Sequence, residues 1–403
     1  MADINLTQAN PGALLAMEKY TVDRARDARA LLRHRLRSTA NVLSTGVAAL
    51  CLAAIYSDAN AMPAAPGERT LQSRTGRNEP DERTRAWIQT SLDVWETICR
   101  RYLRIGLEPL PWMIFYDETQ AWHLAADQTL LPPHEQPATS LLFNGRQQTL
   151  LRVPHDNTEL WVPSGVLPIG SGKAPHAFAM PYDKGTKSFF VLPLPSVVRS
   201  LGGDRYQNPE ALLLGLAGHE LAHTRQLVDV MRRIRTLRQK HDVPMGVDDN
   251  FIQKSYSADQ EYARLFALEG NSFFRAVMED SDRQASRRLL LEALSFEELR
   301  RTRFFTGPRA VHAELDDIFL VMEGVGEWVR FQLKRQQAPP ASPWRATLNE
   351  MMVESDSWSQ QEGLVLFLLI DRLVPNWQSR FLSPNFPSPF AVLREALTTA
   401  NPK

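Results

Sequence analysis

The chain has 403 residues, of which 43% are hydrophobic and 23% charged, and its 46 basic side chains balance 46 acidic ones for a formal net charge of +0. Such a composition is typical of a folded protein and not of a disordered one. The balanced charge gives no reason to expect nucleic acid or an anionic membrane as a partner. Two cysteines, Cys51 and Cys99, are too few for a disulfide framework or a cysteine-based metal site.

The first 61 residues have the pattern of an export signal. Arginines are frequent between positions 24 and 37, residues 40–55 are apolar and uncharged, and Ala59-Asn60-Ala61 is a small-x-small cleavage pattern. We therefore expect residues 1–61 to be a signal peptide and the mature protein to be exported, periplasmic or secreted, from a bacterium, with no stable membrane span. A retained membrane anchor and an internal core helix are the alternatives.

The remaining chain divides by composition into a mixed half and a helical half. Residues 62–81 are rich in Pro, Gly and Arg and predict a flexible leader, and residues 82–103 have helical apolar spacing. Short β-favouring runs predict strands at 111–116, 149–153, 159–162 and 188–194. From Pro209 onward nearly every segment favours helix, broken by the Pro-rich stretch 338–343. We expect an α+β fold, with an α+β subdomain at 82–207 and a helical metal-binding subdomain at 208–403.

The most informative segment is His219-Glu220-Leu221-Ala222-His223, an HExxH motif. Asn208 and Pro209 form a helix start ahead of it, so the motif lies in the middle of a long helix. Residues four apart share one face of a helix, so His219 and His223 can offer two imidazole nitrogens to one Zn²⁺. Glu220 is placed to act as general base on a zinc-bound water, as in metallopeptidases.

A catalytic zinc needs a third protein ligand, and three glutamates on later helices are candidates. Glu269 is the first choice, because it lies in an apolar helix face and precedes Gly270. Glu323 is the second, also followed by glycine and with Glu327 one turn on. This spacing resembles that of gluzincin-type HExxH peptidases, in which a second acid orients a ligating histidine. Glu261 is the third.

The motif and the Leu268-Glu269-Gly270 segment resemble the gluzincin group of HExxH peptidases, in particular uncharacterised bacterial gluzincin-like proteins. The resemblance covers roughly residues 208–277. It implies a zincin-like fold, in which a small sheet precedes the active-site helix, and a strand that binds extended peptide, for which residues 188–194 are the candidate. It also implies a zinc metallopeptidase with a peptide or protein substrate. A catalytically inactive zincin-scaffold binding protein and a zinc hydrolase of a non-peptide amide or ester are the alternatives.

Overall fold

The computed structural model describes residues 79–124, 130, 135–155, 158–168, 177–202, 208–340 and 342–399. The predicted signal peptide, 1–61, lies outside these residues, as does the leader up to residue 78. All described residues belong to one compact unit, Leu43–Lys403. The division of this unit into subdomains at 207/208 stays a prediction.

The N-terminal half contains a six-stranded mixed sheet with the order β3-β4-β2-β1-β8-β7. Neighbouring strands are antiparallel except β1 and β8, which run parallel. A separate two-stranded hairpin pairs β5 with β6. The strands are β1 (Trp112–Tyr116), β2 (Gln120–Leu124), β3 (Gln136–Phe143), β4 (Arg146–Pro154), β5 (Glu159–Val162), β6 (Gly165–Pro168), β7 (Phe178–Tyr182) and β8 (Lys187–Pro193).

The four predicted strands correspond to β1, β4, β5 and β8. Every residue of β1 is buried, which is why it is a continuous apolar run without alternation. The prediction that residues 188–194 form a peptide-binding edge is wrong, because β8 pairs with β1 on one side and β7 on the other. The edge strand on this side of the described sheet is β7.

The other regular elements of the described chain are helices. They are α3 (Glu82–Thr97), which continues into a π-helical turn (Ile98–Leu103), α4 (Pro195–Gly202), α5 (Pro209–Lys240), α6 (Phe251–Tyr256), α7 (Gln260–Met278), α8 (Arg283–Phe304), α9 (Val311–Gln337), α10 (Trp344–Glu354), α11 (Trp358–Leu373), α12 (Gln378–Phe381) and α13 (Pro389–Thr399). Short 3-10 turns occupy Asp183–Gly185 and Gly307–Ala310. The predicted α+β organisation, with a mixed sheet followed by a mostly helical half, is therefore confirmed.

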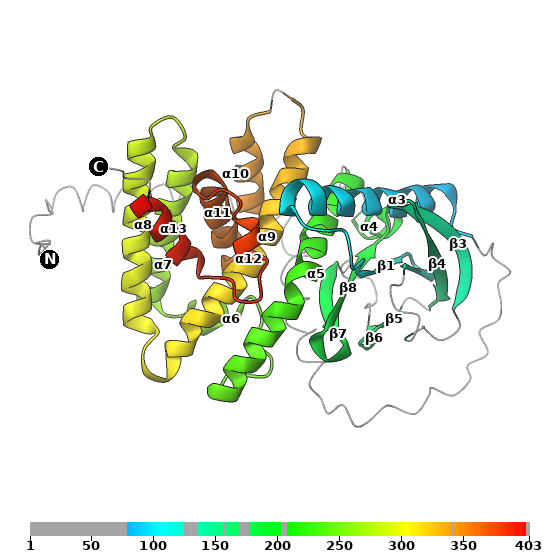
Figure 1. Cartoon of the computed structure of the whole chain (residues 1–403), viewed down its shortest axis with the longest axis horizontal. Coiled ribbons are helices and arrows are strands. Elements are labelled where there is room, and N and C mark those ends of the chain that lie inside the picture. The colour runs from blue at the N-terminus through cyan, green and yellow to red at the C-terminus, as the bar shows by residue number, and fades with distance from the viewer. Residues whose placement is uncertain are drawn as a thin grey trace, which may run out of the picture. The chain divides into compact units, whose positions relative to one another are not determined.

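The long helix α5 carries the HExxH motif and lies between the sheet and the helical half (Figure 1). Its N-cap is Asn208, whose side chain accepts a hydrogen bond from the Ala211 N–H at 3.0 Å, and Pro209 follows in the first turn. One side of α5 packs on β7 and β8, and another side packs along α9. The motif therefore lies between the edge of the sheet and helix α9.

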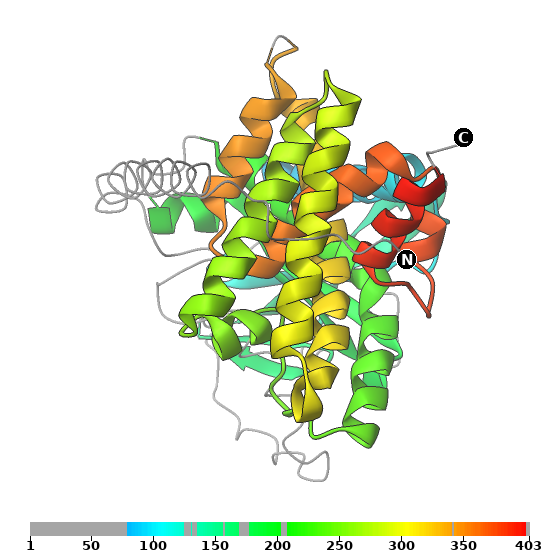
Figure 2. The same ribbon diagram turned by 90° about the vertical axis from the view of Figure 1, so that its left-hand side faces the viewer.

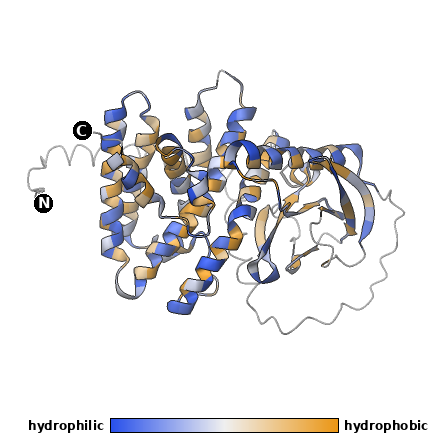
Figure 3. Cartoon of the chain, viewed as in Figure 1, coloured by the Kyte–Doolittle hydropathy of each residue, from blue (hydrophilic) through white to orange (hydrophobic). Residues whose placement is uncertain are grey.

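The remaining helices pack around α9 and its neighbour α11. Helices α7 and α8 stand side by side, in yellow-green and yellow (Figure 2), and α11 packs against both α9 and α7. The largest group of buried apolar side chains joins α3, the sheet, α5, α9 and α11 into one core. The basic C-terminal end of α5 is hydrophilic, as Figure 3 shows. No helix in the described part of the chain is both long and apolar enough to cross a membrane.

Candidate metal site

Three buried side chains meet where α5 packs against α9. His219 Nε2 lies 3.4 Å from one carboxylate oxygen of Glu323, and His223 Nε2 lies 3.4 Å from the other. The exposed fractions of the three residues are between 3% and 6%. One nitrogen or oxygen atom from each lies within 4.8 Å of the others, which makes this a candidate metal site in the described residues.

The spacing of these atoms fits ligands around one metal ion. Two ligand atoms about 2.0–2.1 Å from a tetrahedral zinc are roughly 3.3–3.4 Å apart, which is the separation found here. A direct charge-assisted hydrogen bond between imidazole and carboxylate is shorter, about 2.7–2.9 Å. The donor set of two imidazoles and one carboxylate is also one that zinc commonly takes.

Glu327 contacts the opposite side of the His219 ring. Its carboxylate oxygen lies 3.1 Å from His219 Nδ1, while Nε2 faces Glu323. Glu327 lies 3.2 Å from Arg330, and Arg330 lies 2.6 Å from Glu354. A carboxylate behind a ligating histidine fixes the ring orientation and raises the basicity of the nitrogen that faces the metal. The Arg330–Glu354 pair in turn holds Glu327 in place.

Gly326 allows the two imidazoles to lie directly against the backbone of α9. A Cβ atom at this position would be 2.9 Å from His223 Cε1 and 3.0 Å from both Cε1 and Nδ1 of His219. The two rings are themselves in edge-to-face contact, with centroids 4.3 Å apart. The two carboxylates, Glu323 and Glu327, therefore lie one turn apart on α9, and the histidines pack against the glycine between them.

Two glutamines add to the support of the site. Gln360, on α11, donates a hydrogen bond to Glu323 at 3.1 Å. Gln226, one turn beyond His223, donates to the backbone carbonyl of Val321 at 3.2 Å and ties α5 to α9. Both are amides, which satisfy buried polar groups without adding charge.

Charge in the site is concentrated on the His219–Glu323 pair. Burial by itself lowers the pKa of His219, but the neighbouring Glu323 and Glu327 carboxylates raise that pKa well above its usual value. Burial raises the pKa of Glu323, but the two histidines outweigh it and hold that pKa below its ordinary range. Without metal the pair is therefore an imidazolium and a carboxylate, and a metal ion would take the place of the imidazolium proton.

Glu220 lies beside the candidate ligands and faces the sheet. Burial raises the pKa of its carboxyl group; the two histidines lower it, Glu323 raises it, and a hydrogen bond from the Ala179 N–H on β7 lowers it. The net effect is an increase. Unlike the three candidate ligands, which are buried, Glu220 keeps an intermediate exposure to solvent. A carboxyl group with a raised pKa and access to water is suited to proton transfer near neutral pH.

Neither of the other two candidate ligands comes to the histidines, so the preferred third ligand is corrected from Glu269 to Glu323. Glu269 is fully buried and forms a bidentate ion pair with Arg300, at 2.6 and 2.9 Å. Glu261 lies near the protein surface and pairs with Arg303 at 2.5 Å. A Cβ atom on Gly270, which follows Glu269, would meet no atom within 4 Å, so no other helix approaches closely at this position.

Sequence reasoning missed Gly326, Arg330 and Gln360 as parts of the site. The first two carried a usable signal: a glycine three residues after Glu323 and an arginine three residues after Glu327 lie on the same helix face as those acids. Gln360 carried none, because its helix comes from a distant part of the chain.

No protein-family model, curated protein or solved structure gives a significant match to this chain.

Proposed function

We propose that this chain is a zinc-dependent hydrolase and that it cleaves peptides. His219, His223 and Glu323 would hold the zinc ion, with Glu327 orienting His219. The observation that carries the proposal is the meeting of both HExxH histidines with one glutamate, at atom separations suited to a shared metal ion.

The residues of the chain have distinct tasks in such a reaction. When bound, zinc would lower the pKa of water and polarise the carbonyl group of the substrate. Glu220 takes a proton from the attacking water and then donates it to the nitrogen of the leaving amine, which breaks the amide bond. Its raised pKa favours both halves of this transfer. An intact Glu220 supports an enzyme over an inactive metal-binding scaffold, because metal binding alone does not require this residue.

The position of β7 supports a peptide as the substrate. β7 is the edge strand of the described sheet, and its Ala179 N–H reaches Glu220. An extended peptide laid along a strand edge is held by backbone hydrogen bonds beside the reacting group. Pro181 has no N–H, so any such pairing ends near Ala179 and does not continue along the whole strand.

The test is metal content, measured on the full-length protein and on two glutamate variants. We expect about one zinc ion per chain for wild type. Glu323→Gln should weaken zinc binding by about a hundredfold or more, because it removes a charged ligand. Glu261→Gln is the matched control and should bind zinc as wild type does. Failure of the folded wild-type protein to bind zinc would overturn the proposal.

A second measurement separates a hydrolase from an inactive scaffold. Glu220→Gln should keep its zinc but lose hydrolysis of a mixed peptide library by about 10²–10⁴-fold, because the proton acceptor is gone. Equal cleavage by wild type and Glu220→Gln would show that Glu220 is not the general base. Zinc binding without cleavage of peptides by wild type would favour a non-peptide substrate or a binding role.

A further inference from the structure

The turn between α10 and α11 is connected to both α9 glutamates of the candidate metal site. Glu354, the last residue of α10, contacts Arg330, which in turn contacts Glu327. The next residue, Ser355, begins a separate connection that ends at the carboxylate of Glu323. Two adjacent residues therefore act on the two acids that face the histidines.

The connection from Ser355 to Glu323 consists of two hydrogen bonds through Gln360. The Ser355 hydroxyl donates to Gln360 Oε1 at 2.7 Å, and Gln360 Nε2 donates to Glu323 Oε2 at 3.1 Å. Ser355 and Glu323 are both buried, and Gln360 is half-buried. Behind them, the backbone N–H of Ser357 donates to the Ser355 hydroxyl oxygen at 3.2 Å.

The groups at the two ends determine the direction of every bond in this connection. A carboxylate can only accept, so Gln360 must present its NH₂ group to Glu323 and its amide oxygen to Ser355. The backbone N–H of Ser357 can only donate, so it uses a lone pair of the Ser355 hydroxyl and leaves the hydroxyl proton for Gln360. The Gln360 amide therefore has one orientation in which both of its ends are satisfied.

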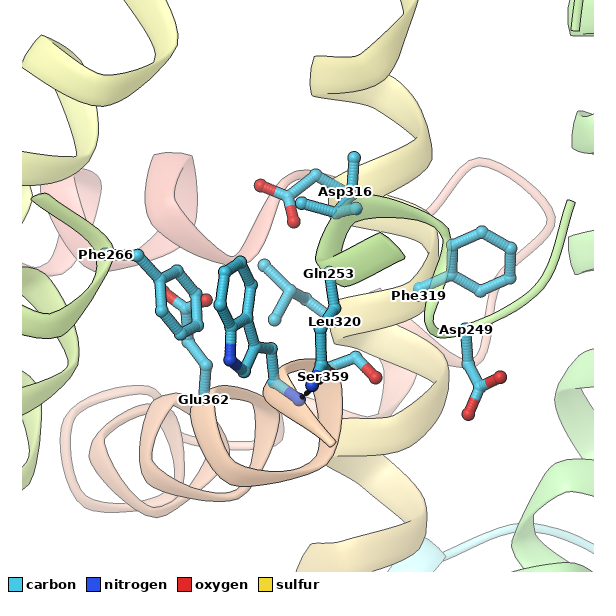
Figure 4. A pocket seen from close by; sticks show the side chains of 10 residues that line it. Asp249, Gln253, Phe266, Asp316, Phe319, Leu320, Ser359 and Glu362 are labelled. Atoms are coloured by element: carbon cyan, nitrogen blue, oxygen red, sulfur yellow. Dashed lines mark hydrogen bonds between the residues drawn. The ribbon is translucent and has the colours of Figure 1, made fainter. Parts of the chain in front are cut away.

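The turn that carries Ser355 is itself tied to its surroundings. Gln361 Nε2 donates to the Ser355 carbonyl oxygen at 2.6 Å. Gln253 accepts a hydrogen bond from the Trp358 N–H at 2.9 Å and donates to the Asp356 carbonyl oxygen at 3.1 Å. Figure 4 shows Gln253 reaching from α6 toward the start of α11. Ser355 is therefore a fixed point from which the Gln360 side chain can be oriented.

We propose that Ser355 and Gln360 are positioning residues of the metal site, which hold the Glu323 carboxylate where it meets both histidines. A hydrogen bond to one oxygen restricts rotation of the carboxylate, so that less freedom is lost when a metal ion binds. Through Glu354 and Ser355, the α10–α11 turn positions Glu327 and Glu323 together. This inference rests on the proposed zinc site.

The experiment is zinc affinity of the full-length protein, measured by competition with a coloured chelator. Gln360→Met keeps the size of the side chain and removes its N–H donor, so zinc affinity should fall by about 10–100-fold. The matched control is Gln336→Met, the same exchange at a glutamine of α9 that contacts Tyr102, and it should bind zinc as wild type does.

A second variant tests the same connection from its other end. Ser355→Ala removes only one oxygen atom and leaves the Gln360 amide without its donor, so zinc affinity should fall by about two- to tenfold. If Ser355 acts through Gln360, this change should have no further effect in Gln360→Met. Effects that multiply in the double variant would overturn the connection.

The visible absorption of the Co²⁺-loaded protein gives a measurement that a general loss of stability does not change. At saturating Co²⁺, Gln360→Met should alter the absorption bands, because a displaced carboxylate changes the ligand field, and Gln336→Met should not. An unchanged spectrum in Gln360→Met would contradict the positioning role.

The proposed function and this inference fail in different ways. If zinc binds to wild type and is lost in Glu323→Gln, but binds normally to Gln360→Met and Ser355→Ala, the zinc site stands and the positioning role is wrong. If the folded wild-type protein binds no zinc, both are wrong.

Discussion

At the scale of single residues, the candidate metal site requires that position 326 have no side chain. Both imidazoles of the motif lie within about 3 Å of the place where a Cβ would be. These contacts are too close for any side chain, so Gly326 controls how near His219 and His223 can come to Glu323.

Replacement of Gly326 by alanine should therefore weaken metal binding. An added methyl group in a packed site costs about 1–3 kcal/mol, which corresponds to a roughly tenfold to hundredfold lower zinc affinity. Competition with a coloured chelator measures it. Gly270→Ala is the control, since a methyl group there meets nothing within 4 Å. That variant should bind zinc normally and gain about 0.5–1 kcal/mol of stability from helix propensity. Unchanged zinc affinity in Gly326→Ala would rule out the close packing described.

The support behind His219 gives a second prediction at this scale. Arg330 is buried between Glu327 and Glu354, so its loss leaves Glu327 without a counter-charge. Arg330→Gln should lower zinc affinity by about 10–100-fold, as removal of such outer partners usually does. Lys334→Gln, one turn further and paired instead with Glu350 and Glu354, should have little effect. Equal affinities in the two variants would show that Arg330 does not act through His219.

At the scale of elements, the crossing of α9 and α11 positions Glu323 relative to Gln360. The two helices touch through Gly324 and Gly363. A Cβ on Gly363 would lie 2.7 Å from the Gly324 backbone nitrogen and 3.0 Å from the Leu320 carbonyl oxygen. Backbone atoms cannot move aside as a side chain can, so the crossing requires glycine at both positions.

Gly363→Ala should therefore destabilise the protein by about 3 kcal/mol, near the upper end for an overpacked core. Urea unfolding followed by circular dichroism measures the change, with Gly270→Ala again as the control. Wild-type stability in Gly363→Ala would mean that the helices are further apart than the structure shows.

The secondary-structure elements were easier to predict from the sequence than which elements pack or pair with one another. The strand Glu159–Val162 and the helix that begins at Pro209 follow from local patterns of β-favouring residues and capping signals. The place of β8 inside the sheet could not be read this way. Its apolar run fits either an edge or an interior strand, and only the pairing with both β1 and β7 decides between them.

At the scale of the whole molecule, stability of the metal-free protein should fall as pH rises from about 6 to 9. Burial lowers the pKa of His219, but Glu323 and Glu327 raise it above 6.5, so its contribution is complete below that value and is lost as pH rises through the folded pKa. Burial, together with the Glu323 and Asp248 carboxylates, raises the pKa of Asp249 from 3.8 to about 8. The folded state therefore also becomes less stable as pH rises toward 8. In both cases the folded protein holds more protons than the unfolded chain.

Zinc should reverse part of this trend, because the metal displaces the proton of His219 and binds more tightly as pH rises. Thermal unfolding across this pH range, with zinc and with a chelator, tests the prediction. The two Tm curves should diverge toward high pH. Parallel curves would mean that His219 is not a ligand.

The sequence by itself determined that two imidazoles share one helix face, because residues four apart on a helix must do so. It also determined the α+β order of the chain. Only the tertiary structure shows which glutamate meets the two histidines. Glu269 and Glu323 both precede glycine in apolar helices, so their local signals are nearly equal. A buried carboxylate needs a positive partner, and packing alone determines which one it meets: Arg300 for Glu269, and the two histidines for Glu323.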